Sequence, residues 1–81
     1  MNLNDKQLKF VDEWIKDVMH INVDYELINE SVEIGYREPV IFIKFKDEWG
    51  NEYIDSTGLT KNMLDVMTSE ADSVQSWISK L

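Results

Sequence analysis

Apolar residues near the start of the chain recur at the spacing of an amphipathic helix. Intervals of three and four residues separate Leu8, Val11, Ile15 and Val18. Such spacing places one apolar stripe on one face of a helix, and Trp14 widens it. Asn4 is a good N-cap, and Gln7, three residues later, can complete a capping box. We therefore predict a helix over residues 5–19, in which Phe10 lies off the main stripe.

From residue 21 the apolar residues follow a period of two. The alternating positions are Ile21, Val23, Tyr25 and Leu27. This alternation predicts a half-buried strand. The next apolar residues are Val32, Ile34 and Tyr36. Because these positions are even-numbered, the register has slipped by one residue, and we expect a bulge or a turn near residues 28–30.

The strongest strand signal covers residues 40–46, where three odd-numbered apolar residues share one face. A turn over residues 47–51 and a return strand over residues 52–55 complete a predicted hairpin. Residues 56–58, with the sequence Ser-Thr-Gly, are expected to break the sheet.

Two further helices are predicted over residues 60–68 and 70–80, with one bent helix as the alternative. Thr60 can cap the first of them and Ser69 the second. The fold class is therefore α+β, in a single domain over residues 1–81 with the element order αβββα(α). Its antiparallel sheet has three strands, with a fourth short strand as an open alternative. The predicted core comprises Leu8, Val11, Ile15, Val18, Ile41, Ile43, Phe45, Val74 and Ile78.

Composition limits the chemistry open to this chain. Its 81 residues are 43% hydrophobic, which suffices for one core and excludes wholesale disorder. The lack of cysteine excludes disulfides, zinc–thiolate sites and thiol catalysis, and the single histidine excludes a multi-histidine metal site. The longest apolar run, residues 40–43, is far shorter than a membrane span of about 20 residues. Residues 1–5 lack the features of a secretory signal, so we expect a soluble cytoplasmic protein.

Acidic residues dominate the charge and are concentrated in the middle of the chain. Sixteen Asp and Glu against eight Lys and Arg give a net charge of −8. Residues 21–57 hold nine of the acids and only three of the bases. This excess opposes binding to nucleic-acid phosphates or to anionic membranes. The acids either keep a small domain soluble or form a face for a basic partner.

No residue pattern points to catalysis or to a metal. His20 lies at a predicted helix end, where the helix dipole favours a cation. The turn over residues 47–52 has oxygen ligands but lacks the ligand spacing of an EF-hand. We therefore expect no enzymatic activity, catalytic residue, metal or cofactor. A hydrolase that uses two carboxylates stays open as a third interpretation.

The predicted binding site is the acidic hairpin. Its residues are Asp47, Glu48, Trp49, Gly50, Asn51, Glu52, Tyr53 and Asp55. Secondary candidates are Asp24, Glu26, Glu30 and Glu33. Trp49 either folds back over the sheet or is presented to a partner. The second alternative fits the enrichment of tryptophan at binding hot spots. Trp14 and Trp77 sit at helical spacing and are predicted to belong to the core.

The hairpin resembles part of a known family. Residues 42–47 (FIKFKD) and 50–54 (GNEYI), followed by Ser56, are similar to the second hairpin of small acidic phage-encoded type II-A anti-CRISPR proteins. The first five residues and the predicted element order are similar as well. Members of this family inhibit the guide-RNA-directed nuclease by imitating DNA with acidic side chains. The resemblance implies that Asp47, Gly50, Asn51 and Glu52 are contact residues, and Glu48 and Trp49 are an insertion relative to the family's turn.

The sequence thus predicts a non-enzymatic, acidic protein-binding module. It would inhibit an enzyme that handles nucleic acid, such as a CRISPR nuclease, by imitating nucleic acid in a basic groove. The alternative is a small structural or regulatory domain that self-associates through its apolar helices, as a homodimer for example, with acids that only confer solubility.

Overall fold

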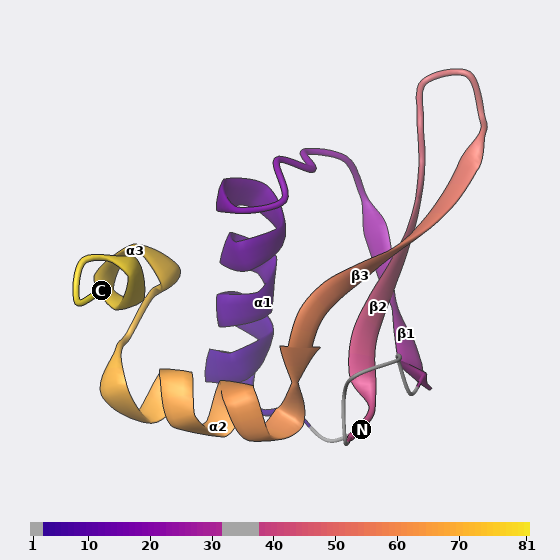
Figure 1. The fold of residues 1–81 in the computed structure, drawn as a ribbon. Coiled ribbons are helices and arrows are strands. Elements are labelled where there is room, and N and C mark those ends of the chain that lie inside the picture. Colours follow the sequence, from indigo (N-terminus) through magenta and orange to yellow (C-terminus); the bar gives the residue numbers. More distant parts are fainter. Residues whose placement is uncertain (1–2, 32–37) are drawn as a thin grey trace.

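The computed structural model describes residues 3–31 and 38–81, without the side chains of residues 29–31. Its elements are α1 (Asp5–Asp17), β1 (Tyr25–Ser31), β2 (Val40–Lys46), β3 (Glu52–Thr60), α2 (Lys61–Glu70) and α3 (Val74–Ile78). The strands form one antiparallel sheet in the order β1-β2-β3, and the helices lie on one side of it (Figure 1). This arrangement confirms the α+β fold class. No fourth strand occurs in the described ranges, and no helix in them is long and apolar enough to cross a membrane.

Helix α1 begins as the sequence predicts but ends earlier. The Asn4 side chain accepts a hydrogen bond from the Gln7 backbone N–H at 2.8 Å, and the Asn4 N–H donates to Gln7 Oε1 at 3.3 Å. These two contacts confirm the capping box. The helix ends at Asp17 instead of residue 19, and His20 then adopts a left-handed backbone conformation with φ 59°.

The buried face of α1 is rotated relative to the prediction. Phe10, predicted to lie off the stripe, is buried, whereas Leu8 and Val18 are 42% and 37% exposed. The predicted core positions of Leu8 and Val18 are therefore wrong. The buried stripe centres on Val11, so Leu8 falls at its border, and Val18 already lies outside the helix at the C-cap.

The core forms where the three helices meet β2 and the end of β3. It consists of Phe10, Val11, Ile15, Ile41, Ile43, Leu59, Leu64, Met67 and Val74. Five of the nine predicted core residues are confirmed, and Phe45 packs against the core half-buried. Ile78 is 42% exposed, which corrects the prediction. Helix α3 is only five residues long, so only its first residue, Val74, is fully buried. Trp14 and Trp77 pack against the core, half-buried, as expected.

Both outer strands differ from the prediction in length. Strand β1 begins at Tyr25 and not at residue 21, and its register against β2 shifts between Ile28 and Ser31, where the slip is predicted. The prediction of a register slip used Val32, Ile34 and Tyr36, and these residues lie outside the described residues. Strand β3 does not break at residues 56–58 but continues to Thr60.

An irregularity in β3 absorbs the Ser-Thr-Gly segment. Val40 pairs with Thr60 and Phe42 with Ser56, so β3 advances four residues while β2 advances two. The Thr57 hydroxyl donates to the Ile41 carbonyl at 2.7 Å, and Gly58 adopts φ 72°, a conformation that favours glycine. The segment therefore bends the strand instead of ending the sheet.

The two C-terminal helices are both present. Thr60 caps α2 by accepting a hydrogen bond from the Met63 N–H at 3.1 Å, as predicted. Ser73, and not Ser69, caps α3, because the Ser69 hydroxyl donates back to the Val66 carbonyl at 2.7 Å within α2. That back-bonding is typical of serine inside a helix. Helix α2 therefore runs through Glu70, two residues beyond its predicted end.

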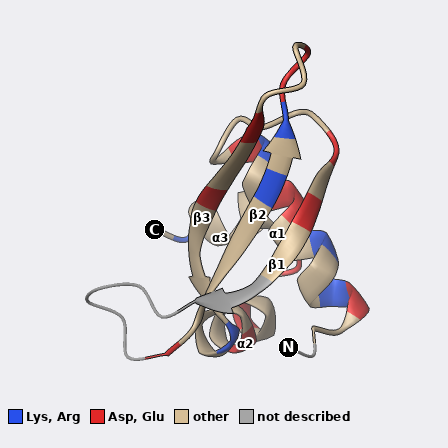
Figure 2. Ribbon diagram, turned by 90° about the vertical axis from the view of Figure 1, so that its right-hand side faces the viewer, with Lys and Arg blue, Asp and Glu red and all other residues tan. Residues whose placement is uncertain are grey.

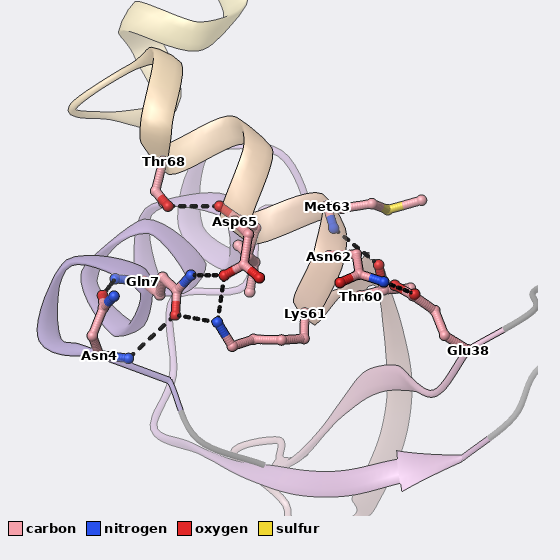
Figure 3. Close-up of polar contacts among 10 residues, drawn as sticks. Asn4, Gln7, Glu38, Thr60, Lys61, Asn62, Met63, Asp65 and Thr68 are labelled. Carbon is pink, nitrogen blue, oxygen red and sulfur yellow. Dashed lines mark hydrogen bonds and ion pairs between the residues drawn. The ribbon is translucent and has the colours of Figure 1, made fainter.

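A polar junction joins the start of α1 to α2 (Figure 3). Gln7 Nε2 donates to Asp65 Oδ1 at 2.6 Å, and Lys61 Nζ donates to Gln7 Oε1 at 3.2 Å. Lys61 and Asp65 also form an ion pair. The lysine, and then the glutamine amide, hold the pKa of Asp65 below its usual value.

Candidate functional site

The β2–β3 hairpin projects beyond the end of α1, and its turn forms one tip of the molecule (Figure 1). The turn is closed by two backbone hydrogen bonds, from Asp47 N to Asn51 O at 3.0 Å and from Gly50 N to Asp47 O at 3.1 Å. Gly50 adopts φ 85°, which explains why a glycine serves here. The local sequence therefore encodes a well-defined turn.

The Asp47 carboxylate organises this turn. Its Oδ1 accepts hydrogen bonds from the backbone N–H groups of Trp49 and Asn51, at 2.9 and 2.8 Å. Its Oδ2 accepts from the Asn51 side-chain amide and the Tyr53 hydroxyl, at 3.1 and 3.0 Å. Partial burial acts to raise the pKa of Asp47, but the hydrogen bonds from Asn51, Tyr53 and Trp49 together lower it below its usual value. Asp47 is therefore engaged within the turn, and its role as a contact residue stays a prediction.

Trp49 is presented to solvent. Its side chain is at the tip of the turn, and the residue is 78% exposed, so the alternative in which it folds back over the sheet is wrong. Two more apolar residues of the hairpin are accessible, Ile54 at 63% and Tyr53 at 46%. Tyr53 and Ile54 are consecutive residues of β3, so their side chains face opposite sides of the sheet. Trp49 is therefore the large apolar side chain exposed at the tip itself.

A row of three aromatic rings connects the hairpin to the rest of the fold. Tyr25, Phe45 and Tyr53 are successive cross-strand partners, and the Phe45 and Tyr53 rings stack with centroids 5.5 Å apart. The Tyr25 hydroxyl donates to Asp12 on α1 at 2.7 Å. Burial, and then this hydrogen bond, raise the pKa of Tyr25. The base of the hairpin is thus fastened to α1.

Lysines of β2 lie among the predicted acidic contact residues. Lys44 forms an ion pair with Glu52 at 3.3 Å and is the cross-strand partner of Glu26, while Lys46 pairs in register with Glu52. Figure 2 shows basic positions on β2, in blue, between acidic positions on β1 and β3, in red. The alternation of residues 42, 44 and 46 predicts that both lysines lie on one face of the strand, at its solvent-exposed end, but it does not predict their pairing with these acids.

The remaining hairpin acids are exposed. Glu48 lies beside Trp49 at the tip, and Asp55 accepts a hydrogen bond from the Ser56 N–H at 2.9 Å. Glu48 therefore reaches solvent at the tip, whereas Asp55 does so farther along β3, where it pairs in register with Ile43.

The secondary candidates partly join the same surface. Asp24 and Glu26 line a hollow of about 430 Å³ together with Lys44, Lys46 and Glu52. In the sequence the two acidic groups are separate, whereas cross-strand pairing brings Glu26 and Glu52 to either side of Lys44 and Lys46. The side chain of Glu30 and all of Glu33 lie outside the described residues.

A second surface, which the sequence analysis missed, lies between α2 and α3. Its hollow is lined by Asn62, Met63, Val66, Met67 and Trp77, none of which is charged. Met63 is 41% and Val66 54% exposed. Apolar residues at helical spacing predict a helix but do not say whether a neighbouring element covers each of them, so this surface had no clear sequence signal.

The described residues hold no group of three or more His, Cys, Asp or Glu side chains that could bind a metal ion. His20 is exposed at the end of α1. The hairpin offers an indole, a phenol ring and carboxylates, which are groups suited to recognition. Comparisons of this chain with family models, with curated proteins and with solved structures give no match.

Proposed function

We propose that this chain is a non-enzymatic protein-binding module and that its β2–β3 hairpin docks on a basic protein surface. The observation that carries the proposal is the 78% exposure of Trp49 at the tip of a braced, projecting turn. Exposed apolar surface is unfavourable in water, and buried tryptophan is a frequent hot spot of protein interfaces. A partner that buries Trp49 would gain the free energy of removing its indole from water. The cost in conformational entropy would be small, because the turn is already ordered.

The charge of the chain supports a basic partner. The net charge is −8, and exposed Glu48 is adjacent to Trp49, while exposed Asp55 lies farther along β3. Long-range attraction would steer a basic surface toward the hairpin and raise the association rate. Because Lys44 and Lys46 lie between the acids, the attraction is centred on the tip and the outer strands rather than on the whole sheet.

The more specific form of the proposal is an inhibitor that occupies a basic groove of a cytoplasmic nucleic-acid-handling enzyme, such as a CRISPR nuclease. Carboxylates two residues apart on a strand would be spaced by about 6.6 Å, close to the phosphate spacing of a nucleic acid. Asp24, immediately before β1, and Glu26, within it, are two residues apart. The resemblance of residues 42–54 to anti-CRISPR proteins is the other support for this form.

A capture experiment tests the proposal. The immobilised protein is exposed to a bacterial extract and washed at roughly 50 mM and then 500 mM salt, because screening at high salt weakens charge-steered contacts. The test variant combines Glu48→Gln, Glu52→Gln and Asp55→Asn, and leaves Asp47 in place because its carboxylate holds the turn. The control removes three remote charges by Asp17→Asn, Glu70→Gln and Asp72→Asn.

We expect a basic protein to be retained by the parent and the control at low salt and released at high salt. The hairpin variant should lose most of this retention. Equal retention by the hairpin variant would show that the acidic hairpin is not the site.

Self-association is a second candidate function, favoured by the uncharged hollow between α2 and α3. Two negatively charged copies could approach there with their acidic hairpins apart, since α2 and α3, whose residues line the hollow, lie away from the hairpin turn (Figure 1). Such a contact would be small, at the weak end of known interfaces.

A further inference from the structure

We infer that Trp49 is an anchor that enters an apolar pocket with a basic rim on the partner, and that Asp47 is the positioning residue that holds Trp49 ready for it. This inference rests on the proposed function and specifies how the hairpin binds. It also assigns Asp47 a role different from that of a contact residue.

The first support is the set of hydrogen bonds around Asp47. Both of its oxygens are used, and two of the four donors are backbone N–H groups of the turn itself, those of Trp49 and Asn51. The backbone of Trp49 is thus tied directly to the carboxylate that closes the turn. A charged acceptor with several donors makes strong hydrogen bonds.

The second support is the contrast between Trp49 and Tyr53. Tyr53 donates its hydroxyl to Asp47 and stacks on Phe45, so its ring is held within the hairpin. Trp49 has its backbone fixed and its side chain left 78% exposed. The turn is therefore ordered independently of the indole, and the indole is available for a partner. Binding by such a preformed tip loses little conformational entropy.

The chemistry of the pocket follows from the neighbours of Trp49. An indole buries about 150–250 Å² and packs well against apolar or aromatic walls. Glu48 is adjacent in sequence and exposed, and Glu52, which forms an ion pair with Lys44, follows at the start of β3. Lysine or arginine around the pocket would complement these carboxylates. The same acids disfavour insertion of Trp49 into an anionic membrane.

A charge-matched pair of variants separates positioning from charge. Asp47→Ala and Glu48→Ala each remove one carboxylate from the same turn, but only the first removes the hydrogen bonds. Without any partner, amide hydrogen exchange by NMR should show about tenfold faster exchange at Asn51 N–H in Asp47→Ala, as expected for loss of one hydrogen bond. Glu48→Ala should leave it unchanged. Tyr53→Phe, which removes one donor and no charge, should give a smaller effect in the same direction.

Binding kinetics then test the anchor, with the protein purified from the salt-released fraction of the capture experiment as the probe. Glu48→Ala should mainly lower the association rate, whereas Asp47→Ala and Trp49→Ala should each raise the dissociation rate about tenfold or more. Asp47→Ala should have little further effect on dissociation when Trp49→Ala is already present, because Asp47 acts through Trp49.

Each outcome has a distinct meaning. Equal effects of Asp47→Ala and Glu48→Ala, or additive effects of Asp47→Ala and Trp49→Ala, would overturn the positioning role. An unchanged dissociation rate in Trp49→Ala would overturn the anchor while leaving the hairpin site intact. Failure of the parent protein to retain any salt-sensitive partner would overturn the proposed function, and the anchor with it.

Discussion

Gln7 and Asp65 are 58 residues apart in the sequence, yet the side-chain amide of Gln7 donates to the Asp65 carboxylate at 2.6 Å (Figure 3). Gln7 is only 2% exposed and also accepts hydrogen bonds from Lys61 and from the backbone of Asn4. One side chain therefore completes the cap of α1 and joins that helix to α2. These polar contacts add to the packing of Leu64 and Met67 in holding α2 against the rest of the fold.

Replacing Gln7 should destabilise the fold. Gln7→Ala removes hydrogen bonds to Asn4, Lys61 and Asp65 and leaves a gap at a buried position, which costs about 1–3 kcal/mol in the free energy of unfolding. The same change at the exposed Lys9 on α1 should cost less than about 0.5 kcal/mol. Urea denaturation of both variants measures the difference. If Gln7→Ala is as stable as Lys9→Ala, the junction contributes nothing to stability.

Two apolar positions that the sequence analysis grouped together should behave differently. Ile43 is fully buried, so Ile43→Ala should lower the free energy of unfolding by about 2–5 kcal/mol through lost burial and a cavity. Val18 is 37% exposed, and Val18→Ala should cost less than about 1 kcal/mol. Equal costs, measured by the same urea titrations, would contradict the described end of α1.

Acid should weaken the native contacts of three aspartates. The pKa values of Asp12, Asp47 and Asp65 lie below the usual 3.8. Because the folded state binds these protons less tightly than the unfolded state, the stabilisation is present above pH 3.8 and is lost as the pH falls through the lowered values.

The variant Asp12→Asn isolates one of these contributions. The pKa of Asp12 is lowered mainly by the hydrogen bond from Lys16 and next by the hydrogen bond from Tyr25. Asp12→Asn should be less stable than the parent at pH 7, and the difference should shrink as the pH falls below about 4. The comparison requires urea midpoints at several pH values. A difference that grows toward low pH would contradict the assignment.

Self-association through α2 and α3 predicts a mass that rises with concentration in sedimentation equilibrium. Val66→Glu should abolish that rise, because it buries a charge in the contact. Asn22→Glu adds the same charge at an exposed position between α1 and β1, outside the hollow, and should leave that rise unchanged. A parent protein that stays monomeric at millimolar concentration would exclude this second candidate function.

Local signals in the sequence predicted the parts of the fold that depend on neighbouring residues. The Asn4 cap, the limits of β2 and the Thr60 cap all arise from contacts within four residues or from a strict period. The rotation of α1 could not be predicted, because the sheet decides which helical positions are covered. The extension of β3 depends on Thr57 reaching the Ile41 carbonyl, sixteen residues away.

The candidate site shows the same division. The turn over residues 47–51 was predicted from its residue types, and Trp49 was recognised as either packed or presented. The engagement of Asp47 could not be predicted, because an acidic residue in a turn looks the same whether its carboxylate faces solvent or the backbone. The Lys44–Glu52 pair required the cross-strand register, which the sequence only suggests.

Site-specific photo-crosslinking tests the central claim, that the hairpin tip is the contact with a basic partner. A photoreactive benzoylphenylalanine replaces Trp49 in one variant and exposed Gln75 on α3 in another, and each is irradiated with the captured protein at low salt. We predict a crosslinked product from position 49 that disappears at high salt, and little from position 75. Crosslinking from position 75 with none from position 49 would contradict the claim.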